Sequence, residues 1–211
     1  MSCDQRNESL FQVILRMLAF IGKGSHPEMF AHIQPHGHAT ARLVRYFARS
    51  CVPDIERVGL TLSEFSFGAH LHDVGKYLLS KSILLKPGRL NEEEYAAISL
   101  HPIYGANVLS HFTEITEPIR RIVLHHHEHW DGSGYPDGLS GVAIPIEARA
   151  VAIADVYTSL RSRRSYKRSL AKAEALVLMG EMAGRKLDPC LTEDFIALVR
   201  DNPAQVSYRS A

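Results

Sequence analysis

Apolar residues recur every three or four positions along most of the chain, and this spacing predicts helices. The first such segment is an amphipathic helix that ends near Gly22 or Gly24. Its apolar positions are Leu10, Ile14, Met17, Leu18 and Ile21. The strict alternation of apolar and polar residues that marks a half-buried strand is almost absent. The pattern therefore predicts an all-α fold.

Start and stop signals divide the next part of the chain into separate elements. We expect a short helix over residues 28–34, stopped by Pro35, and a second helix over residues 38–49 with an apolar side. The segment Thr61-Leu62-Ser63-Glu64 has the form of a capping box, and the helix behind it runs toward His72 and Asp73.

Prolines and capping residues mark the later helices in the same way. Asn91 precedes three glutamates, which suit the positive end of a helix dipole. A further helix over residues 169–183 is closed by Gly184. The other expected helix starts are Pro102, Pro118, Pro145 and Asp188-Pro189.

Length and composition describe one ordinary globular domain. The chain has 211 residues, of which 45% are hydrophobic, and a net charge of +1, so no strong field attracts a nucleic acid polymer or an anionic membrane. Cys3, Cys51 and Cys190 are odd in number and widely spaced, which argues against a disulfide framework. No run of residues has the form of a signal peptide or a membrane span, and we expect a cytoplasmic protein.

Histidine is over-represented, and the segment His125 to Pro136 concentrates it. These twelve residues hold four imidazoles, two carboxylates and the only Trp of the chain before a Gly- and Pro-rich loop. Imidazole is the commonest metal ligand in proteins. Adjacent histidines on a helix point about 100° apart, so they reach two neighbouring ions more easily than one. The alternative is an accidental, solvated histidine cluster.

Other polar blocks in the chain argue against an accident. They are Gly37-His38, residues 71–76 with His72-Asp73, residues 101–105 with His101, and residues 153–156 with Asp155. In this order, the blocks resemble the HD phosphohydrolase superfamily. The segment from His126-His127-Glu128 to Gly134-Tyr135-Pro136 resembles its HD-GYP branch, the bacterial phosphodiesterases of cyclic di-GMP. The resemblance covers roughly residues 36 to 195.

The resemblance implies an HD-domain helical bundle with a metal site in its core. It implies that His38, His72, Asp73 and Asp155 hold one divalent ion, and that Asp73 bridges to a second ion held by His101, His126 and His127. Iron and manganese are the expected metals, because neutral imidazoles and carboxylates suit them. Two ions about 3.5–4 Å apart can lower the pKa of a bound water and clamp the oxygens of an in-line displacement. Any one of these histidines taken alone could be structural.

Four residues are expected to act on the substrate. Lys76, three residues after Asp73, could hold a phosphate oxygen or help to protonate the leaving oxygen, or could be a solvated lysine. Tyr135 resembles the family residue that contacts the substrate, and the alternative is a tyrosine that anchors its loop. Arg164 and Lys167 fall where the family binds phosphate, although the basic run around them could be a solvated turn.

The chain also departs from the family pattern. Gln34 stands four residues before His38, where some members have the Glu that holds a third metal, so we expect two ions. The spacing between Gly37-His38 and His72 differs by two residues from that of a typical member, so His36 remains an alternative ligand. Thr158 and Ser165 replace an Asp and a Pro. We expect Glu128 and Asp131 to orient ligating histidines. Three further histidines match no family ligand, namely His70, His125 and His129.

The sequence therefore predicts a stand-alone catalytic domain over residues 36–211 after a helical extension over residues 1–35. The resemblance implies a metal-dependent cyclic di-GMP phosphodiesterase that forms linear pGpG, and it leaves open whether pGpG is cleaved further to GMP. The alternatives are a cyclic-dinucleotide sensor or docking module without hydrolysis, and an HD phosphohydrolase of another nucleotide. Besides the cyclic dinucleotide, two kinds of partner are possible for this chain. They are a second copy of the chain, in a homodimer, and signalling proteins of the GGDEF type.

Overall fold

The computed structural model describes residues 27–51, 53–162 and 169–201 of the chain. Within these ranges the chain is helical and has no β-strand, apart from an isolated bridge between Ala183 and Leu187. The prediction of an all-α fold is confirmed. The helix expected over residues 10–21 lies outside the described residues.

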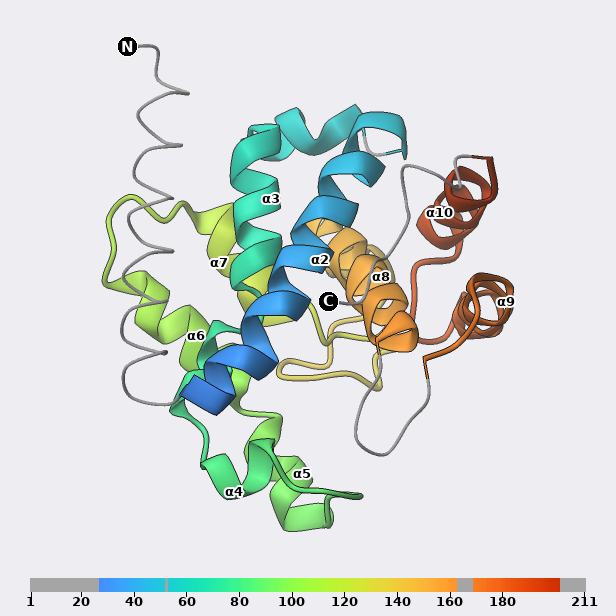
Figure 1. Cartoon of the computed structure of the whole chain (residues 1–211). Helices are drawn as coiled ribbons and strands as arrows, with labels where there is room; N and C mark the ends of the chain where they lie inside the picture. Colours follow the sequence, from blue (N-terminus) through green and yellow to red (C-terminus); the bar gives the residue numbers. More distant parts are fainter. Residues whose placement is uncertain (1–26, 52, 163–168, 202–211) are drawn as a thin grey trace.

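Four helices form the centre of the bundle (Figure 1), and α2 packs against both α3 and α8, which in turn contact α7. These helices are α2 (Pro27–Cys51), α3 (Leu62–Leu71), α7 (Glu117–His125) and α8 (Ile146–Arg161). On one side α9 (Lys172–Met182) and α10 (Pro189–Asp201) pack against α8, and on the other side α6 (His101–Ser110) packs against α7. The short elements are η1 (Pro53–Val58), η2 (Val74–Leu78), α4 (Lys81–Leu84), α5 (Glu92–Ile98) and η3 (Gly141–Ala143).

Aromatic side chains join α2, α8 and α10 in the core. The ring of Phe195 lies edge-on to the ring of Phe47, with centroids 5.2 Å apart, and to the ring of Tyr157, with centroids 5.4 Å apart. All three side chains are fully buried. Burial of such a side chain stabilises the fold by about 1.5–3 kcal/mol, and edge-to-face pairs add to this. The core thereby fixes α2 relative to α8, the two helices that contribute to the site described below.

The helix α2 is longer than the sequence predicted. It runs without interruption for 25 residues and contains Pro35, so the predicted break at Pro35 is wrong. A proline inside a helix removes one hydrogen bond and crowds the preceding turn. Here Met29 and Ile33 before Pro35, and Val44 and Phe47 after it, are all buried on the same helix, and their packing outweighs that local cost. The predicted division between residues 35 and 36 therefore falls within a continuous helix.

The predicted helix caps at Thr61 and Asn91 are confirmed. Thr61 Oγ1 accepts from the backbone N–H of Glu64 at 3.2 Å, and the Glu64 carboxylate accepts from the Thr61 N–H at 2.8 Å. Asn91 and Glu94 make the same reciprocal pair at the start of α5. Helices α6, α7, α8 and α10 begin at or next to the predicted prolines. In the described part of the chain, no helix combines the length and the apolar character needed to cross a membrane.

Candidate metal centre

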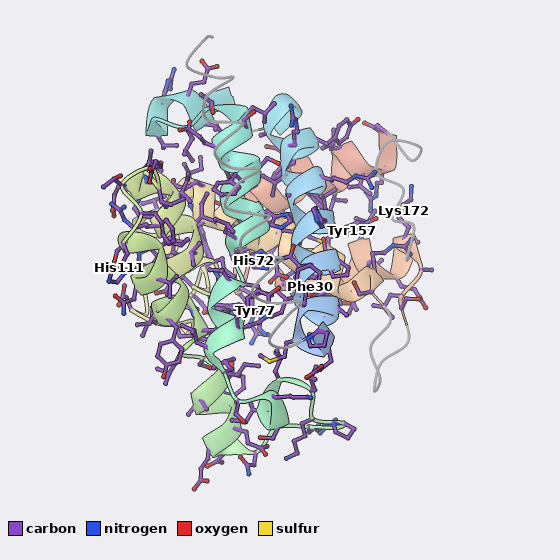
Figure 2. All side chains as sticks on the ribbon, turned by 60° about the vertical axis from the view of Figure 1, so that its left-hand side comes forward. Phe30, His72, Tyr77, His111, Tyr157 and Lys172 are labelled. Carbon is purple, nitrogen blue, oxygen red and sulfur yellow. The ribbon has the colours of Figure 1, made fainter. Side chains whose placement is uncertain are left out.

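Imidazoles and carboxylates from distant parts of the chain meet in the middle of the bundle. Figure 2 shows His72 near the centre of the molecule, whereas His111 and Lys172 lie at its edges. The side chains form two groups, and within each group the candidate ligand atoms, one nitrogen or oxygen per residue, lie within 4.8 Å of one another. One group is His36, His72 and Asp155, and the other is Asp73, His101, His126 and His127.

The first group joins α2, the end of α3 and α8. The Nε2 atom of His36 lies 2.7 Å from Asp155 Oδ1, and the Nε2 atom of His72 lies 3.9 Å from the same oxygen. Helix packing of α2 against α3 and α8 brings these residues together, although more than eighty positions separate His72 from Asp155.

His36, the alternative that the sequence left open, lies in this group in place of His38. His38 is exposed, and its ring packs against the ring of His70 with centroids 4.2 Å apart. Residues two apart on a helix point about 200° apart, so only one of the two histidines can face the site. Because α2 is continuous through Pro35, its buried face selects His36.

Asp73 lies between the two groups and turns one oxygen to each. Its Oδ2 lies 3.4 Å from His72 Nε2 and 4.0 Å from His36 Nε2. Its Oδ1 lies 3.2 Å from His101 Nε2 and 3.8 Å from His126 Nε2. A carboxylate in this position has the two oxygens needed to serve two neighbouring cations.

Three of the histidines are held in the same way. In His72, His101 and His126 the Nδ1 atom donates to the carbonyl oxygen three residues earlier, at 2.7, 2.7 and 2.9 Å. A carbonyl can only accept, so the proton of each neutral ring is on Nδ1. The other nitrogen, Nε2, then presents a lone pair to the centre. Bonds of this kind orient metal-binding histidines in proteins.

Several buried atoms at the centre have no hydrogen-bond partner, as a bound cation would require. His72 Nε2 and Asp73 Oδ1 are buried and without a partner. The Nε2 atoms of His101 and His126 lie 3.3 Å apart, although both would present lone pairs. Unpartnered buried acceptors cost stability. Divalent cations between them would satisfy all of these atoms, so the residues fit a metal centre.

The ionisation states of His126, His127, Asp73 and Asp155 also suit metal binding. For His72, burial opposes the charged ring, but Asp73 outweighs this and raises its pKa, so a cation bound there must displace a proton. Burial lowers the pKa of His126 to about 4 and holds the pKa of His127 well below its ordinary value, so both rings are neutral near pH 7. Burial disfavours the charged carboxylate of Asp73, but Lys76 and His72 outweigh this and hold its pKa well below the usual range. Burial likewise opposes the charge of Asp155, and the hydrogen bond from His36 outweighs it, so its pKa is also well below normal.

The end of α7 explains how two adjacent histidines reach one group. The helix ends at His125, His126 caps it, and His127 lies beyond it. Because His127 lies beyond the helix, its side chain need not point about 100° away from that of His126, and both rings can face the same group. Its ring lies 5.0 Å from the ring of His101 and 4.9 Å from the ring of Tyr135. The half-buried Tyr135 is thus part of the wall of the centre.

Lys76 lies beside the bridging position rather than in solvent. Its Nζ donates to Asp73 Oδ2 at 2.6 Å, and only 18% of its side chain is exposed. Asp73 directly precedes η2 and Lys76 lies within it, and η2 packs closely against α6. A Cβ added to Gly75 would lie 1.9 Å from the carbonyl oxygen of His101, so only glycine fits between Asp73 and this part of α6.

Glu128 does not orient the ligating histidines as predicted. The side chain is 2% exposed, and its two oxygens accept from the backbone N–H groups of Asp137 at 2.8 Å and Leu139 at 3.1 Å. The exposed Asp131 accepts from the N–H of Ser133. Both carboxylates therefore shape the loop that carries Tyr135. The sequence did not predict this, because the path of an irregular loop is not encoded by periodicity.

Gln34 also has a different place from the one expected. Its amide oxygen lies 2.9 Å from His70 Nε2, and its amide nitrogen donates to the Tyr77 hydroxyl at 3.2 Å. With His36 in the first group, the position four residues earlier is His32 rather than Gln34. Gln34 is therefore not at the position of the family Glu that holds a third metal.

Two predicted phosphate-binding residues, Arg164 and Lys167, lie outside the described residues, as does Ser165. Thr158 is buried in α8, and its hydroxyl donates to the Ala154 carbonyl at 2.7 Å. This bond satisfies the side chain within its own helix.

Comparison with known sequences finds relatives over much of the chain. The cyclic di-GMP phosphodiesterase response regulator RpfG of Xanthomonas campestris is 44% identical over 64% of the chain, which spans 36% of that protein. A cyclic di-GMP phosphodiesterase of Thermotoga maritima is 34% identical over 91% of the chain, which spans 50% of it. A 3'3'-cGAMP-specific phosphodiesterase of Vibrio cholerae is 36% identical over 76% of the chain, and the match covers 32% of that protein. The chain thus spans half or less of each of these relatives.

Solved structures share the fold. A protein of Bdellovibrio bacteriovorus, Bd1817, superposes with a TM-score of 0.61 at 23% identity, over 80% of this chain and 52% of its own. The HD domain of the Listeria monocytogenes phosphodiesterase PgpH superposes with a TM-score of 0.56 at 16% identity, over 92% of this chain and 98% of its own. The HD domain family itself matches residues 25–191, a span that begins ahead of α2 and holds both groups of side chains. The chain belongs to the HD domain family.

Proposed function

We propose that this chain is a metal-dependent phosphodiesterase that opens cyclic di-GMP to linear pGpG and then cleaves pGpG to GMP. The observation that carries the proposal is the position of Asp73, with one oxygen toward each of two buried groups of ligand atoms. The names of the relatives support the substrate class, because both RpfG and the Thermotoga maritima protein are named cyclic di-GMP phosphodiesterases.

The donor atoms favour two divalent cations, and iron or manganese matches their nitrogen and oxygen chemistry. We assign His36, His72 and Asp155 to one cation, His101, His126 and His127 to the other, and Asp73 to both. When bound, the pair supplies charge neutralisation at the phosphoryl group and an ionised water at neutral pH.

The remaining residues of the site position the substrate and the ligands. Lys76 holds Asp73 Oδ2 in place and carries a positive charge to the site, where it favours a phosphate oxygen. Tyr135 lies against the ring of His127, on the loop held by Glu128, where it can contact the nucleotide. Arg164 and Lys167 remain predicted phosphate contacts. A homodimer, GGDEF-type partners and a cytoplasmic location remain predictions that accompany this function.

Hydrolysis and ligand assignment can be tested together. The protein, loaded with iron or manganese, is incubated with cyclic di-GMP, and pGpG and GMP are separated by chromatography. We expect turnover in the wild type, a loss of at least about 100-fold in His36→Ala, and near-normal turnover in the matched variant His38→Ala. Absence of products from the metal-loaded wild type would refute the proposed hydrolysis. Loss of turnover in His38→Ala with retention in His36→Ala would refute the ligand assignment.

A second substrate is favoured by one specific observation. The Vibrio cholerae relative that is 36% identical over 76% of the chain is named a 3'3'-cGAMP-specific phosphodiesterase. The same assay with 3'3'-cGAMP, at equal concentration and metal loading, compares the two cyclic dinucleotides through their kcat/KM values. A higher value for cyclic di-GMP supports the proposed substrate, and a higher value for 3'3'-cGAMP replaces it.

A further inference from the structure

A third group of ligand atoms lies outside the two groups of the metal centre. It consists of His125 at the end of α7, the buried Glu128, and Asp137, which follows the Gly-Tyr-Pro segment. His125 Nδ1 lies 3.8 Å from Glu128 Oε1 and 3.6 Å from Asp137 Oδ2. None of these three residues is a ligand in the function proposed above.

The nitrogen of His125 is the feature that points to a ligand. The residue is 8% exposed, and its Nδ1 is buried with no hydrogen-bond partner. The two carboxylate oxygens nearest to it are too far for a hydrogen bond, which requires about 2.7–3.2 Å. They are a few tenths of an ångström beyond the separation that a shared cation produces, since a tetrahedral zinc ion with bonds of about 2.0–2.2 Å holds its ligand atoms about 3.4 Å apart.

The two carboxylates differ in a way that suits a cation site. Both oxygens of Glu128 already accept a backbone N–H, which fixes the carboxylate, and a carboxylate oxygen has a second lone pair for a metal. The side chain of Asp137 is 53% exposed, which leaves room for water at the remaining coordination position. Two negative charges and one imidazole neutralise a divalent ion.

We propose that His125, Glu128 and Asp137 bind a third divalent cation, of the zinc type, that ties the loop carrying Tyr135 to the end of α7. The cation would join Asp137, two residues after Tyr135, to the residue directly before His126. It would therefore stiffen the loop over residues 131–139 without taking part in the reaction.

The experiment measures zinc binding to the full chain by calorimetry and by metal analysis after dialysis. Asp137→Asn removes one ligand at an exposed position and keeps the backbone N–H that Glu128 accepts, so it should fold normally. We expect Asp137→Asn to weaken zinc binding at the site of His125, Glu128 and Asp137 by more than about tenfold and to lower the bound zinc by one equivalent. Even the loss of a residue that only hydrogen-bonds to a ligand typically lowers metal affinity by about 10–100-fold. The matched control is Asp131→Asn, an exposed carboxylate of the same loop, which should bind zinc as the wild type does.

A second variant separates this site from the metal centre. Asp73→Asn removes the bridging ligand of the metal centre and leaves the third group intact, so the double variant Asp73→Asn/Asp137→Asn should hold one equivalent of zinc less than Asp73→Asn alone. Hydrogen exchange gives a structural readout, since zinc should slow exchange in residues 131–139 of the wild type and of Asp73→Asn but not of Asp137→Asn. Equal zinc content and equal affinity in the wild type and Asp137→Asn would overturn the third site, whatever the outcome of the hydrolysis assay.

Discussion

Loss of one partner of the ion pair between Arg149 and Asp188 is expected to destabilise the protein strongly. Arg149 on α8 donates through Nη1 to Asp188 Oδ2 at 2.5 Å and through Nε to the Ile144 carbonyl at 2.9 Å. Asp188 Oδ1 also accepts from the N–H of Leu191 at 3.0 Å, which caps the start of α10. The side chains of Asp188 and Arg149 are 4% and 14% exposed. The pair thus joins two helices in a nearly dry environment.

Asp188→Asn removes the charge but keeps an oxygen that can cap α10. Breaking a fully buried pair costs about 3–5 kcal/mol, because one charge remains buried without its partner. Arg149 keeps its bond to Ile144 and has some access to water, so we expect a loss of about 2–3 kcal/mol. Asp188→Ala also removes the cap, which is worth about 1 kcal/mol more.

The free energy of unfolding should be measured by urea denaturation followed by circular dichroism, with a chelator present so that metal binding does not contribute. Asp131→Asn serves as the control, because its exposed carboxylate is expected to change stability by less than about 0.5 kcal/mol. A double-mutant cycle with Arg149→Met isolates the pair, and we expect a coupling of about 2 kcal/mol. If Asp188→Asn is as stable as the Asp131→Asn control, the reasoning about the buried pair is refuted.

Three further predictions follow from the fold and the metal centre. Thr61→Ala should lower the free energy of unfolding by about 1 kcal/mol through loss of the capping box with Glu64, and an unchanged urea midpoint would contradict this. Gly75→Ala should lower the free energy of unfolding by about 3 kcal/mol and reduce bound metal, because the new Cβ meets the His101 carbonyl. Gly180→Ala, at an open position in a helix, should instead raise the free energy of unfolding by about 0.5–1 kcal/mol. Removal of metal with a chelator should lower Tm, since saturation at 100 times Kd stabilises a folded protein by about 2.7 kcal/mol, and equal Tm values with and without metal would argue against a buried metal centre.

The fold could be predicted largely from local patterns. Capping pairs such as Thr61 with Glu64 depend on residues three positions apart, and the structure has them where the sequence placed them. The break at Pro35 was a local rule that failed, because buried contacts along the whole length of α2 outweigh the cost of one proline. Tertiary packing is not visible in a window of a few residues.

The continuity of α2 through Pro35 also bears on the choice of candidate ligand. The choice between His36 and His38 depends on the rotational phase of α2, and that phase is set only if the helix continues through Pro35. The function of Glu128 could not be predicted for a different reason. Its partners, the N–H groups of Asp137 and Leu139, belong to an irregular loop whose path is determined by tertiary contacts.

The Nδ1 bonds of His72, His101 and His126 have a consequence for the kinetics of metal uptake. Each ring is tethered to a carbonyl of its own segment, so its orientation is set when the chain folds and not when an ion arrives. The folded protein then offers preorganised ligands, and we expect the loss of water from the incoming ion to limit the rate of loading. Exchange rates for different metals should accordingly follow the lability of their hydration shells.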